Sequence, residues 1–172
     1  MTEIEVKIRR PDAASAREEL LKAGALLDKE RARETNVLYD FRDKPLTSRR
    51  QALRLRTVGR KCFLTFKGAP QKSRRFKIRE EFEVEVRGEK PARKILQALG
   101  FVPVFRYEKF RTVFRRDRVK ICLDETRLGV FLELEGERSR IIRLVKLLGI
   151  PPAELITLDY VQMLIQAGVE PD

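Results

Sequence analysis

The sequence predicts an α+β fold in which eight antiparallel strands close into a barrel, with helices packed outside it. Eight segments alternate apolar and polar side chains with the period of two that is typical of strands. Residues 16–24 also resemble residues 92–100, and each copy lies between one Glu-rich strand and three further strands. The chain therefore divides into two β-α-β-β-β halves, and closing both into one barrel would leave no exposed sheet edge.

The first half contains a strand, a helix and three more strands. Ile4, Val6 and Ile8 alternate with charged residues in the first strand, and the helix begins near Pro11 and ends at Gly24. A polar loop precedes the third strand, and a hairpin turn at residues 59–60 joins the last two. The predicted elements are the strand 1–10, the helix 11–24, the strand 34–41, a loop through Pro45, and the strands 52–58 and 61–68.

The second half repeats this order after a basic, turn-rich loop at residues 69–75. Its predicted elements are the strand 77–87, the helix 91–99 and the strands 108–115, 118–124 and 129–135. Two helices follow, one at residues 138–148 that Gly149 ends, and one that opens at Pro151-Pro152 and continues to about Ala167. Chance similarity between two amphipathic helices is the alternative explanation of the repeat.

The composition restricts the class of protein. A chain of 172 residues with 42% hydrophobic and 37% charged residues is typical of one folded, highly ionic domain. Its net charge of +12 favours polyanionic partners, which include nucleic acid, anionic lipid and phosphorylated small molecules. There is no apolar run of about 18 residues and no signal-peptide pattern, so we expect a cytoplasmic protein without a membrane span.

Absent and rare residue types also exclude several chemistries. The chain has no histidine, which excludes Ser-His-Asp and Cys-His catalysis and histidine-bound metal. Its two cysteines, Cys62 and Cys122, lie in predicted strands and suggest neither a disulfide framework nor a zinc site. A bound metal would therefore be a hard ion with oxygen ligands, such as magnesium, manganese or calcium.

Nearly every predicted strand has an ionic face opposite its aliphatic face, and the charges are grouped by sign. The residues on these faces are Glu3, Glu5, Lys7, Arg54, Arg56, Thr65, Lys67, Arg79, Glu81, Glu83, Glu85, Lys109, Arg111, Lys120, Asp124, Glu133 and Glu135. For any single strand, a solvated sheet face is the simpler explanation. Like charges two residues apart repel each other, however, unless something lies between them, and a closed barrel would bring all these faces around one lumen.

Such a lumen would suit a triphosphate, which carries about four negative charges and is bound well by arginine and lysine. Facing carboxylates would hold magnesium or manganese, which bridges phosphate oxygens. Two such ions could stabilise an in-line displacement at phosphorus. The sequence has neither a Walker loop nor a kinase signature. Any phosphate site would therefore be built differently.

The first strand resembles a family signature. Glu3-Ile4-Glu5-Val6-Lys7 is similar to the E-x-E-x-K motif of CYTH proteins, the triphosphate tunnel metalloenzymes, which include class IV adenylyl cyclase and thiamine triphosphatase. The length and the segment Leu99-Gly100-Phe101 resemble the short, class IV cyclase-like branch. The similarity continues in order through Thr35-Asn36, Tyr39-Asp40, Ala52-Leu53-Arg54-Leu55-Arg56, Leu64-Thr65-Phe66-Lys67-Gly68, Arg79-Glu80-Glu81-Phe82-Glu83, Lys109-Phe110-Arg111, Leu123-Asp124 and Leu128-Gly129-Val130-Phe131-Leu132-Glu133-Leu134-Glu135.

The resemblance implies a single CYTH domain over residues 1–172, built as a triphosphate tunnel that uses magnesium or manganese. The implied metal ligands are Glu3, Glu5, Glu81, Glu83, Asp124, Glu133 and Glu135. The implied triphosphate ligands are Lys7, Arg54, Arg56, Lys67, Lys109, Arg111 and Lys120. The implied catalytic residues are Glu5, Lys7 and Glu133.

Two reactions stay open at this point. A cyclase would join the ribose 3′-hydroxyl of ATP to the α-phosphorus and release pyrophosphate, whereas a hydrolase would add water to the γ-phosphorus of ATP, inorganic triphosphate or thiamine triphosphate. The alternative function is a non-catalytic module for RNA or polyphosphate, with residues 72–75 as its contact surface. Carboxylates on the same faces would repel a nucleic acid. We expect the protein to be a monomer or a homodimer.

Overall fold

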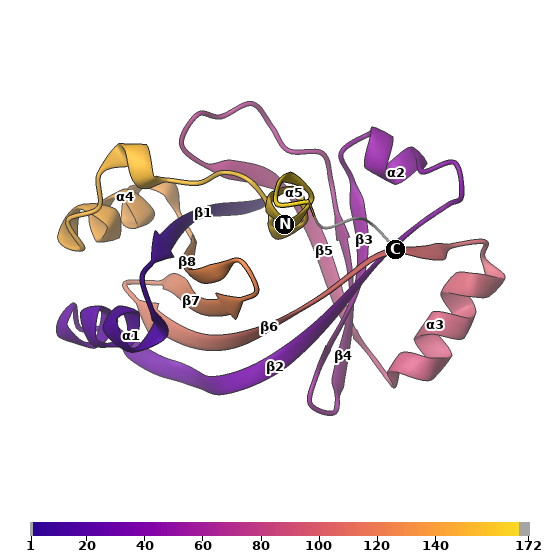
Figure 1. Ribbon diagram of the computed structural model, residues 1–172, viewed down its shortest axis with the longest axis horizontal. Coiled ribbons are helices and arrows are strands. Elements are labelled where there is room, and N and C mark those ends of the chain that lie inside the picture. The colour runs from indigo at the N-terminus through magenta and orange to yellow at the C-terminus, as the bar shows by residue number, and fades with distance from the viewer. Residues whose placement is uncertain (1, 169–172) are drawn as a thin grey trace.

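The strands form a closed antiparallel barrel in the order β1-β5-β4-β3-β2-β6-β7-β8. The computed structural model describes residues 2–168 (Figure 1). The strands are β1 (Thr2–Arg10), β2 (Leu26–Asp40), β3 (Ala52–Val58), β4 (Lys61–Lys67), β5 (Lys77–Val86), β6 (Val102–Arg116), β7 (Val119–Thr126) and β8 (Gly129–Glu135). The predicted fold class, an eight-stranded antiparallel barrel with helices outside, is confirmed. Residue 1 of the predicted first strand lies outside the described residues.

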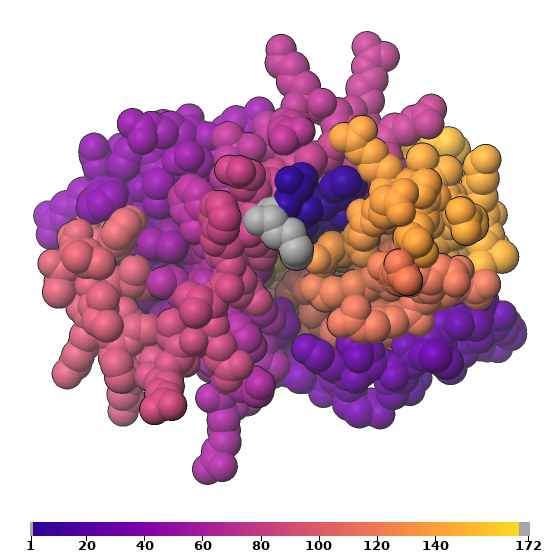
Figure 2. Space-filling model, turned by 180° about the vertical axis from the view of Figure 1, so that it is seen from behind, coloured from indigo at the N-terminus to yellow at the C-terminus, as the bar shows by residue number. Residues whose placement is uncertain are grey.

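The two predicted halves interlock through their first two strands. β1 pairs with β5 and with the last strand of the second half, β8, while β5 pairs with β4, the last strand of the first half. β2 and β6, the strands that follow the helix in each half, pair with each other and close the barrel. Figure 2 shows the indigo start of the chain at the surface between magenta and orange segments, in agreement with its pairing to β5 and β8.

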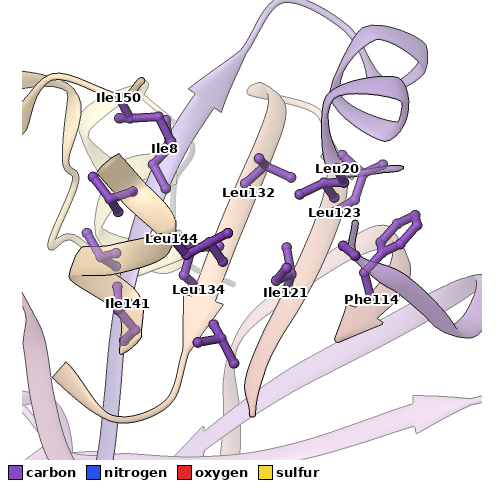
Figure 3. Close-up of a cluster of buried hydrophobic side chains, with 14 of the residues drawn as sticks. Ile8, Leu20, Phe114, Ile121, Leu123, Leu132, Leu134, Ile141, Leu144 and Ile150 are labelled. Atoms are coloured by element: carbon purple, nitrogen blue, oxygen red, sulfur yellow. The ribbon is translucent and has the colours of Figure 1, made fainter. Parts of the chain in front are cut away.

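The helices are α1 (Ala13–Lys22), α2 (Pro45–Ser48), α3 (Glu89–Ala98), α4 (Arg138–Leu147) and α5 (Tyr160–Gln166). α1, α3 and α4 cover the outside of the barrel, whereas α5 packs against side chains of its interior. α1 begins at Asp12, whose carboxylate accepts a 2.8 Å hydrogen bond from the Ser15 backbone N–H. α1 and α4 contribute Leu20, Ile141 and Leu144 to the main core, where they meet the outward aliphatic faces of β1, β7 and β8 (Figure 3). Among the described residues, no helix is long and apolar enough to span a membrane.

Two strands are longer than predicted. β2 begins at Leu26 and β6 at Val102, before their expected starts at Glu34 and Glu108. The two strands pair along almost their whole length, with register shifts that reflect bulges. Residues 26–33 of β2 are mostly exposed, so neither face carries the apolar alternation by which a strand is detected in sequence.

The predicted last helix over residues 151–167 is wrong in its first part. A short 3₁₀ turn at Pro152–Glu154 is followed by an extended segment, in which Ile156 and Lys7 exchange two backbone hydrogen bonds of 2.9 and 2.8 Å. α5 then begins at Asp159, which forms a capping box with Gln162. Pairing with β1 therefore outweighs the helix start that two prolines suggested.

The loop through Pro45 contains α2, which sequence analysis did not predict. Pro45 occupies the first turn of this helix. The buried Asp40 carboxylate accepts hydrogen bonds from the backbone N–H groups of Leu46 and Thr47, at 3.1 and 2.8 Å. The last residue of β2 thereby fixes the start of the next helix.

A second apolar cluster fills part of the barrel interior. It joins inward-facing side chains of β6 and β8 to one side of α5, and its buried members are Phe105, Phe131, Tyr160, Met163 and Leu164. The C-terminal segment is therefore part of the folded barrel, held by the strand contact at Ile156 and by this cluster.

We expect Leu164→Ala to lower the free energy of unfolding by about 2–5 kcal/mol, because Leu164 is 0% exposed and its loss leaves a cavity. The neighbouring Ile165 is 50% exposed, so Ile165→Ala is a matched control that should cost less than about 0.5 kcal/mol. Urea denaturation of both variants checks this. Equal stabilities for the two would contradict the packing of α5 into the barrel.

Candidate functional site

The inside of the barrel carries a buried network of acids and bases. Side chains two residues apart on each strand share the inward face, which explains why ionic residues of every strand meet there. The ionic side chains buried on these faces are Glu3, Glu5, Lys7, Glu34, Lys67, Lys77, Arg79, Lys109, Asp124 and Glu133. Because buried charges are costly unless paired, the pairing of this set determines what the site can bind.

Two lysines join pairs of carboxylates around β1. Lys7 Nζ lies 2.9 Å from Glu5 Oε1 and 2.9 Å from Glu133 Oε2, so it connects β1 to β8. Lys67 Nζ lies 3.1 Å from Glu3 Oε2 and also contacts a carboxylate oxygen of Glu81. Each ammonium group thus lies between two acids from different strands.

A second group of ion pairs is centred on Asp124. Arg111 donates two 2.6 Å hydrogen bonds to its carboxylate, a bidentate geometry, and a third of 3.0 Å to Glu133. Lys109 Nζ adds a 2.9 Å bond to Asp124 and lies 3.9 Å from Glu34. Asp124 and Glu133 therefore share one arginine, which connects this group to the pair around Lys7.

Arg54 and Arg56 are less completely paired. The carboxylates nearest to Arg54 are Glu83 at 3.6 Å and Glu81 at 3.9 Å, and its hydrogen bond to Thr65 is 3.4 Å long. The Nε–H groups of both arginines are buried and have no hydrogen-bond partner within residues 2–168. Two strong donors on neighbouring inward positions of β3 are therefore left for a ligand.

Three of the predicted residues lie in more open surroundings. Lys120 and Glu135 form a 2.7 Å pair whose side chains are 35% and 23% exposed. Glu83, 31% exposed, accepts a 2.9 Å hydrogen bond from Arg56. The structure therefore brings the predicted site residues onto one lumen, with these three at its accessible edge.

Sequence analysis missed three buried residues of this interior. Glu34 and Asn36 occupy inward positions of β2, and Lys77 pairs with Asp159 at 2.8 Å and with Glu5 at 3.8 Å. The side-chain alternation could have placed two of them in the lumen, because Glu34 and Asn36 share one face of a predicted strand. Lys77 likewise alternates with Arg79, a residue that was placed on the ionic face without a role.

Burial and ion pairing shift the pKa values of several side chains in this network. Burial alone would raise the pKa of the Glu3 carboxyl, but Lys67 and Arg79 outweigh burial and hold it well below its usual range. Burial and a hydrogen bond with Glu3 raise the pKa of Glu81 to about 7. Burial disfavours the charged form of Lys7, yet Glu133 and Glu5 raise its pKa above the usual value. Glu3 and Lys7 are therefore charged near neutral pH, whereas Glu81 can take up a proton there.

The donor chemistry of the lumen fits a hard divalent ion. Magnesium and manganese prefer carboxylate oxygens, and two acid pairs supply them, Glu5 with Glu133 and Glu3 with Glu81. Within residues 2–168, no three acidic or cysteine side chains gather into a metal centre, because Lys7 and Lys67 lie between the members of these pairs. Each ammonium marks a position where a cation already bridges two carboxylates.

A cavity of about 270 Å³ adjoins the ionic lumen. It lies between α2, α5 and the neighbouring ends of β2, β3 and β6. Aliphatic and aromatic side chains form much of its wall, including Leu38, Phe105 and Tyr107. Its other lining residues include Arg54 and Lys67, so the cavity and the ionic network share a boundary.

We expect Glu34 to contribute stability that depends on pH. Burial opposes its charge, but Arg111, Lys109 and Arg56 lower its pKa from 4.5 to about 2. A folded pKa below the unfolded value stabilises the fold above pH 4.5, and the contribution is lost as the pH falls toward 2. At pH 7 the free energy of unfolding of wild type should exceed that of Glu34→Gln by up to about 3 kcal/mol. This difference in stability should shrink below pH 4.5.

Urea denaturation at pH 7, 4.5 and 3 measures this difference. Glu85→Gln, which changes an exposed carboxylate of β5, is the control. A difference between wild type and Glu34→Gln that stays constant over this range would contradict the assigned charge of Glu34.

The comparisons with known proteins agree with this geometry. A protein named "Putative adenylate cyclase" from Methanocaldococcus jannaschii is 28% identical, over 95% of this chain and 98% of that protein. A crystal structure of a putative adenylate cyclase from Vibrio parahaemolyticus has a TM-score of 0.84 at 20% identity, with 96% and 98% of the two chains covered. A protein from Hippeastrum, titled a putative adenylyl cyclase with a dominant triphosphatase activity, has a TM-score of 0.69 at 21% identity, over 97% and 95%.

The family assignment rests on a match over most of the chain. The CYTH domain model matches residues 1–149. That one domain spans residues 1–172 stays a prediction, and residues 169–172 lie outside the described part of the chain. Because the match covers far more than half of the sequence and the barrel has the expected strands, the chain belongs to the CYTH domain family.

Proposed function

We propose that the barrel binds a triphosphate together with a divalent metal ion, and that the protein is an enzyme that breaks a phosphoanhydride bond of this ligand. The observation that carries the proposal is the pair of buried guanidinium donors, Arg54 Nε–H and Arg56 Nε–H, which have no partner within residues 2–168. Buried donors without partners are rare because they cost free energy. Phosphate oxygens are acceptors that arginine binds strongly.

The charge balance of the lumen supports a metal complex as the ligand. Its inward bases are Lys7, Arg54, Arg56, Lys67, Lys77, Arg79, Lys109, Arg111 and Lys120, and its inward acids are Glu3, Glu5, Glu34, Glu81, Glu83, Asp124, Glu133 and Glu135. These sets are nearly equal, so a bare triphosphate with about four negative charges would meet as many acids as bases. Divalent ions bound by the acids remove this repulsion.

The residues divide between the two parts of this ligand. Arg54, Arg56, Lys109 and Arg111 project from β3 and β6 and would hold phosphate oxygens, with Lys7, Lys67 and Lys120 as further cations. The acids Glu3, Glu5, Glu81 and Glu133 would hold magnesium or manganese, with Glu83, Asp124 and Glu135 as further oxygen ligands. CYTH proteins generally depend on metal. When bound, the ion would neutralise phosphate charge and activate the attacking oxygen.

Hydrolysis is the reaction proposed first. It requires a water molecule as nucleophile, and the Hippeastrum protein of the same fold is titled with a dominant triphosphatase activity. Cyclisation of ATP is the second candidate, because the relatives from Methanocaldococcus and Vibrio carry adenylate cyclase names. In either reaction Lys7, between Glu5 and Glu133, would orient these two acids in the catalytic centre.

We expect Arg54→Ala to raise the dissociation constant for inorganic triphosphate at least about tenfold, because a charge-assisted hydrogen bond is worth about 1.5–3 kcal/mol. Arg60→Ala removes the same side chain from an exposed turn between β3 and β4 and is the matched control. Calorimetry with magnesium measures both. Equal affinities for wild type and Arg54→Ala would reject the assigned phosphate contact.

We expect Glu133→Gln to reduce turnover at least about 100-fold, by removing a charge from the metal-binding acids. Released phosphate, pyrophosphate and cyclic AMP should be assayed with ATP, inorganic triphosphate and thiamine triphosphate, with magnesium and with manganese. Product identity separates hydrolysis from cyclisation. Glu85→Gln is the control, and circular dichroism verifies that each variant folds.

A chelator should abolish turnover in the wild-type protein. Turnover that survives both the chelator and Glu133→Gln would overturn the metal assignment. Binding of RNA that persists in the chelator and weakens steeply with salt, with no turnover of any triphosphate, would instead favour the non-catalytic module.

A further inference from the structure

Asn36 is an unpaired polar side chain inside the barrel. It is 0% exposed, and neither its amide nitrogen nor its amide oxygen has a hydrogen-bond partner within residues 2–168. It follows Glu34 on the inward face of β2, where Glu34 pairs with Arg56. Buried amides are nearly always hydrogen-bonded, so both ends of this group point to a partner that the protein itself does not supply.

The position of Asn36 is between the ionic network and the cavity. Its partners on the neighbouring strands are Arg56 of β3 and Tyr107 of β6. Two residues further along the same face, Leu38 lines the cavity, and so does Tyr107. A bound molecule that extends from the phosphate-binding side chains into the cavity would therefore pass Asn36.

The cavity has the character of a site for a flat ring. The Tyr107 and Tyr160 rings form a tilted pair with centroids 4.8 Å apart, and both side chains line the cavity. Gln51 and Gln162 add amide groups that can bind ring nitrogen and oxygen atoms. Apolar and aromatic walls with a few polar groups are typical of small-molecule sites, and every nucleobase can stack on an aromatic ring.

We propose that Asn36 and this cavity form a second subsite, which binds the nucleoside part of a nucleoside triphosphate. The cavity receives the base, and the Asn36 amide binds the sugar hydroxyls next to the phosphate chain. One hydroxyl of a ribose can donate a hydrogen bond to the amide oxygen while its neighbour accepts one from the amide nitrogen, so the pair satisfies both polar atoms of Asn36. Inorganic triphosphate would leave the amide unpaired and the cavity unfilled. This inference rests on the proposed binding of a triphosphate in the barrel.

The first experiment compares ATP with inorganic triphosphate by calorimetry, in calcium rather than magnesium to slow turnover. Its readout is the ratio of the ATP dissociation constant to that of inorganic triphosphate. Asn36→Ala removes the amide, and Ala52→Phe adds bulk to the cavity wall on the inward face of β3. Asn36→Ala should raise the ratio at least about tenfold because the polar contact of the amide is lost. Ala52→Phe should raise it by a similar factor because the ring no longer fits the cavity.

Val58→Phe is the matched control, because Val58 lies on the same face of β3 as Ala52, at the other end of the strand and away from the cavity. It should leave the ratio unchanged. A ratio that stays at the wild-type value in both Asn36→Ala and Ala52→Phe would overturn the subsite. Wild-type protein that binds inorganic triphosphate but not ATP would overturn it too. Wild-type protein that binds neither ligand would overturn the proposed function as well.

The second experiment tests the hydroxyl contact directly. Wild type should bind 2′,3′-dideoxy-ATP about tenfold more weakly than ATP, whereas Asn36→Ala should bind the two equally, because the partner of the hydroxyl is gone. Thermal unfolding verifies that Asn36→Ala is folded. Equal losses of affinity in wild type and Asn36→Ala would show that the hydroxyl binds elsewhere and would overturn the assignment of Asn36.

Discussion

The pairing of Lys7 with Glu5 and Glu133 is the contact on which the rest of the barrel depends. It lies where β1 meets β8, the junction between the first and second halves of the chain. Buried charges destabilise a fold unless each finds a partner, so the two halves must close in one register to satisfy them. The same residue binds the C-terminal segment through its backbone, by two hydrogen bonds to Ile156. Barrel closure, the site and the docking of the tail are therefore fixed at one position.

Some side chains of the lumen are fully paired within the protein and others are only partly paired, although both kinds belong to the proposed ligand site. Asp124 and Arg111 satisfy each other with bidentate geometry, and Lys109 completes the group. Arg54, by contrast, has distant carboxylates, and its Nε–H is unpaired within the described residues, as are both ends of Asn36. Arg54 and Asn36 come from β3 and β2, next to the cavity, whereas the fully paired group comes from β6 and β7. The ligand should therefore approach from the side of β2 and β3.

Alternation of side chains was sufficient to predict the eight strands and their ionic faces, because most of those strands have one aliphatic face under a helix or in the core. On β5 the alternation holds although Phe82 and Val84 of its apolar face are exposed. It failed for residues 26–33, which are exposed on both faces and are strand because β6 pairs with them. It failed also for the last helix, where a contact with Lys7 overrides local preference. The pairing of acids with bases could not be predicted either, because cross-strand register is a property of the closed barrel. Asn36 shares a strand face with Glu34 and belongs to the family motif, but that its amide is unpaired within residues 2–168 became evident only in the folded barrel.

The near balance of acids and bases in the lumen affects how a metal ion and a triphosphate would bind there. Lys7 and Lys67 lie between the carboxylates that are proposed to bind a divalent ion, so metal and lysine would compete for the same acids. A triphosphate that entered with its metal would offer the displaced ammonium groups new partners in its own oxygens. Such an exchange would conserve the number of ion pairs, which would keep its cost low in a buried site. Glu81, whose pKa is raised to about 7, is the acid in this set that can gain or lose a proton as the exchange proceeds. A lumen whose acids and bases are nearly balanced would therefore favour a metal–triphosphate complex over either component alone.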